Sequence, residues 1–223
     1  MTDQSTITAA LVDEKVSRVP RQDRSKASLE RMLKAAKRLM ETSGNEDFTL
    51  QDVSKAGKVS IGSIYLRFES KENLVRAVIA NHLEQSMADE AQMFCKISTL
   101  SQNLGEFVVN FVNGYAEFLR HHAPMMRLSM ERARHDPLVS GPGKVAASRA
   151  ARLTRDGMMA YSVEFGGNDR ERRALSAFDA IFSTLARHLA LGSSAETADD
   201  GIEWDVLKQE LARMCLAYLK NSD

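Results

Sequence analysis

The chain has 223 residues, enough to bury a sizeable core and to form one large or two small domains. Apolar residues make up 43% of the chain and charged residues 27%, and proline is scarce at 4 residues, a mixture that favours a globular, helical protein. No apolar run reaches the ~18–20 residues that span a bilayer, and the polar, acidic first residues do not resemble a secretory signal.

The formal net charge is zero, but the charges are unevenly distributed. Basic residues outnumber acidic ones over residues 15–80, whereas acidic residues prevail from residue 81 onward. This basic excess is expected if residues 15–80 bind nucleic-acid phosphates, but an ordinary solvent-exposed surface can have the same excess. Cys95 and Cys215 match no metal spacing and no disulfide framework, so we expect a reducing cytoplasm.

The first part of the chain predicts an arm followed by a helix. Residues 1–20 show no sustained period and are interpreted as a flexible arm, either a solubilising tail or a carrier of arginines for phosphate contacts. Residues 25–42 carry apolar side chains at helical spacing on one stripe, and Gly44 follows as a helix terminator.

Three further helices are predicted between residues 49 and 83. Thr49 begins a capping-box pattern and Gly57 ends the short helix that follows. Ser60 caps a second short helix that runs to Phe68, and Ser70 caps a longer one that runs through Leu83. Two short helices joined by a tight turn have the form of a helix-turn-helix.

These residues resemble the signature of the TetR family of transcriptional regulators. The resemblance covers residues 25–83 and is carried by Phe48, Thr49, Val53, Gly57, Val59, Ser60, Gly62, Tyr65, Phe68, Lys71 and Leu74. It implies a bacterial, cytoplasmic regulator that binds operator DNA, with residues 60–68 as the recognition helix in the major groove.

The resemblance also implies residue roles. Ile61, Gly62 and Ser63 would face base edges, and family members often carry a larger polar residue at the position of Ile61. Tyr65, Arg67 and Lys71 would contact phosphates. The complete predicted DNA-binding set is Thr49, Gln51, Ser60, Ile61, Gly62, Ser63, Tyr65, Arg67 and Lys71. The alternatives are that Tyr65 is a core residue, Lys71 an ordinary first-turn lysine and Ser60 a structural cap.

The remainder of the chain predicts more helices. One spans residues 100–122, another starts at Pro124, and Pro137 with residues 141–143 predicts a break or loop. A long helix over residues 144–165 follows, and two more are predicted over residues 169–191 and 204–220.

This C-terminal part is expected to dimerise and to bind an apolar small-molecule effector. By the resemblance, its last two helices pair with those of a second copy, and a two-fold dimer engages two half-sites. The predicted interface residues are Phe178, Phe182, Leu185, Leu207, Leu211, Met214 and Tyr218. The predicted pocket residues, which as an alternative are plain core residues, are Phe107, Phe111, Tyr115, Met126, Met130, Met158 and Phe178.

No cofactor or metal is predicted, because the histidines and cysteines show no ligand spacing, and no enzyme motif is found. The expected fold is all-α, TetR-like, with an arm (1–20), a three-helix helix-turn-helix DNA-binding domain (21–80) and a helical effector-binding and dimerisation domain (81–223). The expected function is a repressor that a small molecule releases from a palindromic operator. Two alternatives stay open: a constitutive DNA-binding dimer without a ligand, and a helical enzyme or carrier with a vestigial helix-turn-helix.

Overall fold

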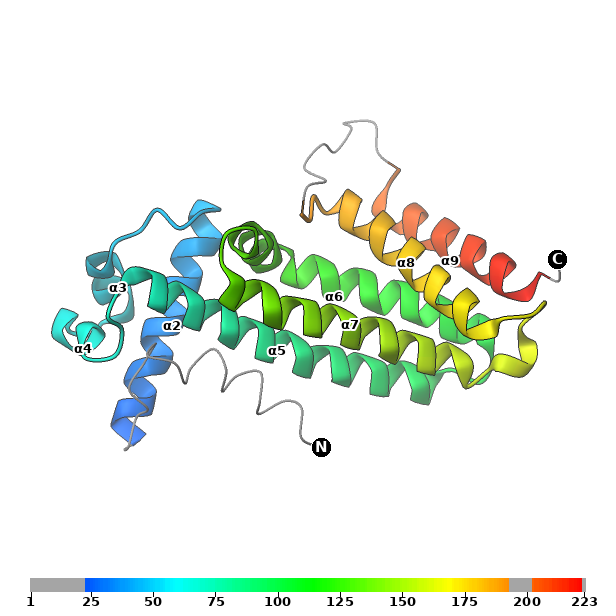
Figure 1. Ribbon diagram of the computed structural model, residues 1–223, viewed down its shortest axis with the longest axis horizontal. Helices are drawn as coiled ribbons and strands as arrows, with labels where there is room; N and C mark the ends of the chain where they lie inside the picture. Colours follow the sequence, from blue (N-terminus) through cyan, green and yellow to red (C-terminus); the bar gives the residue numbers. More distant parts are fainter. Residues whose placement is uncertain (1–22, 193–201, 222–223) are drawn as a thin grey trace. The chain divides into compact units, whose positions relative to one another are not determined.

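The computed structural model describes residues 23–192 and 202–221, and every regular element within those ranges is helical. In chain order the elements are α2 (Asp23–Ser43), α3 (Leu50–Gly57), α4 (Ile61–Tyr65), α5 (Lys71–Leu100), α6 (Leu104–Ala133), α7 (Pro137–Met159), the short 3₁₀ helix η1 (Ser162–Glu164), α8 (Arg170–His188) and α9 (Trp204–Lys220) (Figure 1). The predicted all-α class is confirmed, and the predicted arm lies outside the described residues.

Contacts divide the chain into two units. Unit 1 combines the residues up to Ser86 with Pro124–Gly143, and unit 2 combines Met87–Ala123 with the residues from Lys144 onward. Helices α5, α6 and α7 therefore each contribute residues to both units. The sequence-based boundary between residues 80 and 81 stays a prediction.

The core of unit 1 is built on the apolar stripe of α2. Met32, Ala36 and Met40 are fully buried there, as helical spacing predicts. Helix α3 packs on α2, and α4 packs on α3. The same core contains buried side chains from the other elements of the unit, namely Phe48, Val53, Ile64, Phe68, Leu74, Val75, Val78, Met125, Leu128 and Val139.

The core of unit 2 combines α6 with α8 and α9. Helix α6 buries Phe107 and Phe111, α8 buries Ile181 and Leu185, and α9 buries Leu219. Helices α8 and α9 lie side by side (Figure 1). The two helices predicted over residues 169–191 and 204–220 are thus confirmed.

Two predictions around prolines are wrong. Pro124 lies inside α6 rather than at the start of a new helix, since Met125 and Leu128 continue the helix by packing into the core of unit 1. The loop predicted around residues 137–143 is the start of α7. Pro137 occupies the first helical position, where no backbone donor is needed, and the Asp136 carboxylate accepts a hydrogen bond from the Leu138 backbone N (3.2 Å).

Two helix ends also differ from prediction. Helix α5 continues to Leu100, well beyond Leu83, because Phe94 and Ile97 are buried in its last turns. Helix α7 ends at Met159 instead of continuing to residue 165, and η1 follows it.

Candidate nucleic-acid interface

Helix α3 is positioned by a capping box at its start and a close approach to α2. The Thr49 hydroxyl accepts from the Asp52 backbone N (3.2 Å), and the Asp52 carboxylate accepts from the Thr49 backbone N (2.9 Å). The Asp52 carboxylate also accepts from the Thr49 hydroxyl (2.6 Å), and this hydrogen bond, with the one from the Thr49 backbone N, lowers the pKa of Asp52. At the other end, a Cβ on Gly57 would lie 3.1 Å from the Arg31 carbonyl oxygen, so glycine permits the contact between α2 and α3.

The turn between α3 and α4 is closed by the chain itself. Lys58 adopts the left-handed conformation (φ 51°) as the C-cap of α3. The Ser54 hydroxyl donates to the Val59 carbonyl oxygen (2.6 Å), and Val59 is buried. The turn of the helix-turn-helix is therefore held by specific contacts.

Helix α4 is short and fixed on one side. The Ser60 hydroxyl accepts from the Ser63 backbone N (3.2 Å), and the two hydroxyls lie 2.7 Å apart. Ile64 is fully buried on the inner side of the helix, and Phe68, three residues beyond its end, is fully buried in the same core. The opposite side is therefore free to contact a partner.

The structure places the predicted DNA-binding residues on the surface of unit 1 to different degrees. Thr49, Gln51, Ser60, Gly62 and Tyr65 are exposed. Ile61, Ser63, Arg67 and Lys71 are half-buried. Their contacts with DNA stay predictions.

Arg67 and Lys71 bind other parts of unit 1. Arg67 Nη2 donates to the carbonyl oxygen (2.7 Å) and the hydroxyl (2.5 Å) of Ser25, which ties the end of α4 to the start of α2. Lys71 Nζ donates to the Glu46 carbonyl oxygen (2.7 Å) and lies 5.2 Å from the centre of the Phe48 ring. Both residues thus have a structural role that the motif did not indicate.

An ion-pair network in unit 1 holds the loop before α3. The Asp136 carboxylate accepts from Arg76 Nε (2.7 Å) and Arg132 Nε (3.0 Å). Arg132 Nη1 also donates to the Glu46 carboxylate (2.6 Å). Burial alone would raise the pKa of Asp136, but the hydrogen bonds from the two arginines outweigh it and hold that pKa below its usual value. Sequence reasoning missed this network: Arg132 and Asp136 are four residues apart, but Glu46 and Arg76 lie far from them in the chain.

The predicted effector residues fall into two groups. Phe107, Phe111, Tyr115, Met158 and Phe178 are buried in unit 2, whereas Met126 and Met130 are half-buried in unit 1. In unit 2 the rings of successive α6 turns stack, with centroids 6.1 Å apart for Phe107 and Phe111 and 5.1 Å apart for Phe111 and Tyr115.

A buried ion pair lies in unit 2. Glu90 on α5 is 5% exposed, and its carboxylate accepts from Arg149 Nη1 on α7 (2.6 Å). Burial raises the pKa of Glu90 to about 7, although Arg149 opposes this shift. Burial, assisted by the nearby Glu90 charge, also raises the pKa of Tyr115. No sequence pattern predicted this pair, whose residues are far apart in the chain.

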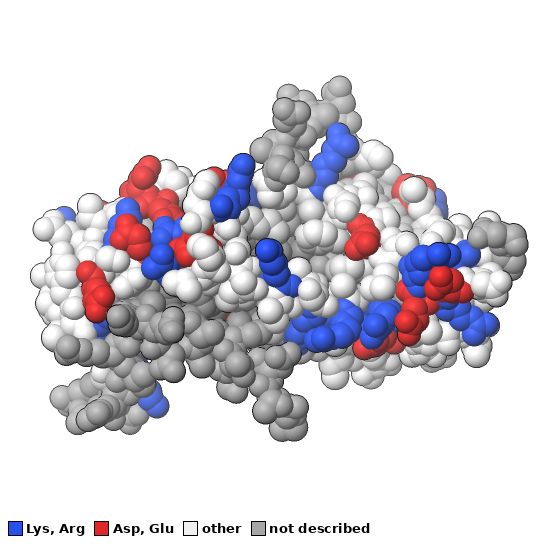
Figure 2. Space-filling model, in the orientation of Figure 1, with Lys and Arg blue, Asp and Glu red and all other residues white. Residues whose placement is uncertain are grey.

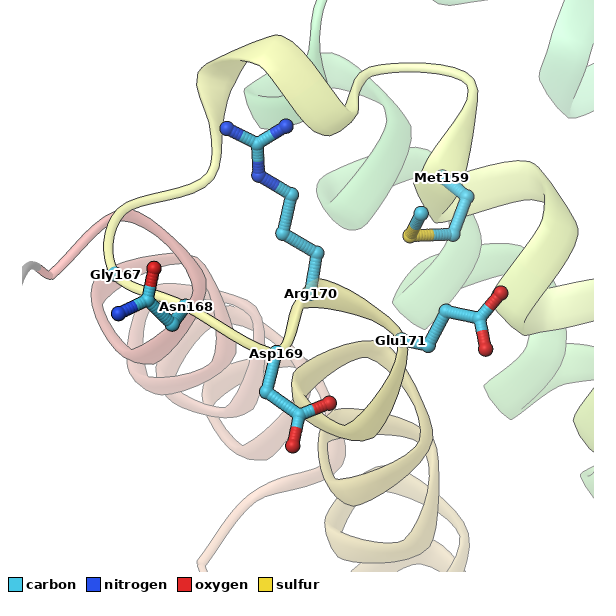
Figure 3. Close-up of a pocket in the computed structure, with 6 residues that line it drawn as sticks. All are labelled: Met159, Gly167, Asn168, Asp169, Arg170 and Glu171. Carbon is cyan, nitrogen blue, oxygen red and sulfur yellow. The ribbon is translucent and has the colours of Figure 1, made fainter.

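A surface hollow lies where α7 ends and α8 begins. Its volume is about 430 Å³, and Met159, Gly167, Asn168, Asp169, Arg170 and Glu171 line it (Figure 3). None of the predicted effector residues lines this hollow. Its exposed rim of charged side chains differs from the apolar pocket that the sequence predicts.

The predicted dimer residues also differ in exposure. Phe178, Leu185 and Leu211 are buried inside unit 2, and Phe182 and Leu207 are half-buried. Met214 (67% exposed) and Tyr218 (43%) project from α9. On the described surface of the same two helices, Leu175 and Val206 are exposed as well.

The described part of the chain contains neither a metal-binding cluster nor a membrane-spanning helix. Within residues 23–192 and 202–221, no group of three histidine, cysteine or acidic side chains could hold a metal ion. Over the same ranges, no helix is both long and apolar enough to cross a membrane.

Comparison with known proteins identifies the N-terminal region. The family model for "Bacterial regulatory proteins, tetR family" matches residues 32–78, which include α3, α4 and the turn between them. The predicted resemblance is thereby confirmed for this region. A comparison with curated proteins finds no match.

Solved structures share the fold. A protein from Mesorhizobium loti, described as a TetR-family transcriptional regulator, matches with a TM-score of 0.66 at 15% identity and covers 89% of this chain and 96% of its own. A protein from Saccharomonospora viridis, described as a transcriptional regulator in complex with choline, has a TM-score of 0.68 at 15% identity over 85% of this chain and 95% of its own. The fatty acid degradation regulator FadR from Bacillus halodurans has a TM-score of 0.59 at 14% identity and covers 84% of this chain and 97% of its own. At these identities the neighbours show a TetR-like fold for this chain.

Proposed function

We propose that this chain, whose residues 32–78 match the family model for bacterial regulatory proteins of the tetR family, is a sequence-specific transcriptional regulator that binds double-stranded operator DNA in the cytoplasm. The observation that carries the proposal is the geometry of α4. Ser60 caps the helix and Ile64 and Phe68 fix its inner side, while its opposite side is exposed. A short, rigidly anchored helix of this kind suits insertion into the major groove.

Selection of binding sites from a random duplex pool with the full-length protein tests this proposal. We expect palindromic sites whose half-sites lie one helical turn, ~34–36 Å, apart. Tyr65→Ala should weaken binding to all sequences, and Ser63→Ala should instead change base preference. The absence of any enriched sequence, even at low ionic strength, would contradict the proposal.

We propose further that the regulator acts as a homodimer through α8 and α9. The support is the set of exposed apolar side chains on these helices, Leu175, Val206, Met214 and Tyr218. Exposed apolar side chains on one pair of packed helices favour burial against another surface. A two-fold pair of chains would present α4 twice, as a palindromic operator requires.

Repression with release by an effector is the proposed mode of action. The effector would bind best to a dimer shape in which the two recognition helices no longer match the half-site spacing. The buried aromatic residues of unit 2, such as Phe111 and Tyr115, support an apolar or aromatic-lined site. Among proteins of the same fold, one was solved with choline and another is a fatty acid degradation regulator, so choline and a fatty acid are rational first ligands.

Trp204 offers a readout for this test, because it is the single tryptophan of the chain. Its indole N donates to the Glu117 carboxylate (2.8 Å) in unit 2. Each ligand should be titrated against free protein and against operator-bound protein. If the ligand releases DNA, operator must weaken ligand binding by the same factor by which ligand weakens operator binding. Equal ligand affinities with and without operator would reject the coupling.

A constitutive DNA-binding dimer is the second candidate function. Tight packing in unit 2 favours it: a Cβ on Gly157 would lie 2.4 Å from Phe107 Cζ, so the ring fills the space beside α7. Failure of every ligand to alter DNA affinity, with palindromic DNA binding intact, would support this candidate.

A further inference from the structure

The outer side of α4 is apolar. Successive residues of a helix are rotated by about 100°, so the side opposite Ile64 is shared by Gly62 and the C-cap residue Leu66, with Ser63 and Tyr65 on its two flanks. Tyr65 is 61% exposed and Leu66 is 65% exposed. In Figure 2, the surface over α4, found from its label in Figure 1, is largely uncharged.

The polar groups of α4 are engaged elsewhere or lie off this side. The hydroxyls of Ser60 and Ser63 lie 2.7 Å apart at the start of the helix, so one of them donates to the other. The Arg67 guanidinium points to Ser25. The sequence of α4 from Ile61 to Tyr65 contains no charged residue. The side chains that usually read guanine or adenine by paired hydrogen bonds are therefore absent from its outer side.

Gly62 allows this surface to come close to a partner. A Cβ at Gly62 would meet nothing within 4 Å, so the fold does not require glycine at this position. Gly62 lacks a side chain between Tyr65 and Leu66, which leaves a shallow apolar surface. In the major groove, the one apolar group that distinguishes bases is the C5 methyl of thymine.

We propose that Leu66, which lies beside Gly62, contacts thymine methyl groups in each operator half-site. This proposal rests on the DNA-binding function proposed above and specifies the base chemistry that α4 reads. Leu66 becomes a specificity-determining residue, although the sequence motif assigned no role to it. Recognition then depends on burial of methyl groups, so it differs from recognition by bidentate hydrogen bonds.

The test removes single methyl groups from the DNA. The operator selected from the random pool is synthesised with deoxyuridine in place of thymine, one position at a time and symmetrically in both half-sites, and affinities are measured by fluorescence polarisation. Deoxyuridine pairs like thymine but lacks the methyl. We expect at least one thymine whose replacement lowers affinity about fourfold per half-site, or on the order of fifteenfold for the symmetric change, from the burial of one methyl each.

Leu66→Ala is the matching protein variant, and Leu100→Ala is its control. Leu100, at the end of α5, is 58% exposed, close to the exposure of Leu66, but lies outside the helix-turn-helix. Leu66→Ala should bind the thymine and deoxyuridine operators with nearly equal affinity, whereas Leu100→Ala should keep the full difference.

The outcomes separate the two proposals. If no sequence is selected, the DNA-binding function itself fails. If a specific site is selected but deoxyuridine binds as well as thymine at every position, DNA reading stands and the methyl contacts are refuted. If the deoxyuridine effect persists in full in Leu66→Ala, the assignment to Leu66 is overturned.

Discussion

Asp136 joins three helices of unit 1 through one buried carboxylate, and its replacement tests the ion-pair network. Its side chain is 5% exposed and accepts from Arg76, Arg132 and the Leu138 backbone N. Asp136→Asn keeps the size of the side chain but removes the charge that both arginines face. Charge-assisted hydrogen bonds contribute about 1.5–3 kcal/mol each, and the amide retains part of them, so we expect the free energy of unfolding to fall by about 2–4 kcal/mol.

Urea unfolding followed by circular dichroism measures this change, with protein concentration held constant because dimerisation shifts apparent stability. Glu131→Gln on α6 is the matched control. The Glu131 side chain is 65% exposed and pairs with Arg134 at 3.3 Å in solvent, so its loss should cost less than about 1 kcal/mol. Equal stability losses in the two variants would refute the assignment of the network as a structural element of unit 1.

The pH dependence of Asp136 gives an independent check. Because its folded-state pKa is lowered, the folded state binds this proton less readily than the unfolded state does. Its contribution is therefore fully present above the unfolded pKa of about 3.9 and is lost as the pH falls through the folded pKa. Asp136→Asn should reduce the loss of stability in this acid range, and an unchanged acid profile would contradict the predicted shift.

Three further predictions concern unit 2, the cap of α4 and the dimer. Burial raises the pKa of Glu90 from about 4.5 to about 7, so between these pH values the folded state binds a proton that the unfolded state has lost. The free energy of unfolding should therefore fall as the pH rises from about 4.5 to about 7. Glu90→Gln should reduce this pH dependence in urea titrations, and the same pH dependence in the variant would contradict the prediction. Ser60→Ala should lower the unfolding free energy by about 1 kcal/mol through loss of the N-cap, whereas Ser98→Ala on the exposed side of α5 should not. Met214→Arg, at a 67% exposed site on α9, should shift the protein toward monomer in sedimentation velocity, and an unchanged dimer would exclude this surface from the interface.

Local sequence signals were sufficient for most helices. The apolar stripe of α2 and the patterns of α8 and α9 predicted those elements, because burial of one side imposes helical spacing on the sequence. Two of the errors came from reading prolines as breaks. Pro124 lies inside α6, where packing of the flanking residues tolerates the missing backbone donor. Pro137 is the first residue of α7, where no backbone donor is needed. The division into two units was not predictable locally, because α5, α6 and α7 pass through both.

The candidate interface was predictable only where its determinants are close in sequence. The caps at Thr49 and Ser60 lie three residues from their partners, and both form as expected. Contacts that join distant segments, such as Arg67 with Ser25 or Arg132 with Glu46, leave no periodic pattern in the sequence. The exposure of Leu66 likewise depends on which side of α4 the core covers.

The dual engagement of Arg67 and Lys71 changes how DNA-binding variants must be interpreted. Lys71 has three donor protons and uses one on the Glu46 carbonyl oxygen, so it can still contact a phosphate, but Lys71→Ala removes a contact within unit 1 as well. The same holds for Arg67, whose guanidinium keeps other donors besides Nη2. A lower DNA affinity of Lys71→Ala could therefore come from the lost phosphate contact or from displacement of the loop before α3. For a substitution of Arg67, the two causes are the lost phosphate contact and displacement of the segment that follows α4. Tyr65, which is 61% exposed, is the cleaner substitution, because its loss of DNA affinity can be assigned to the interface itself.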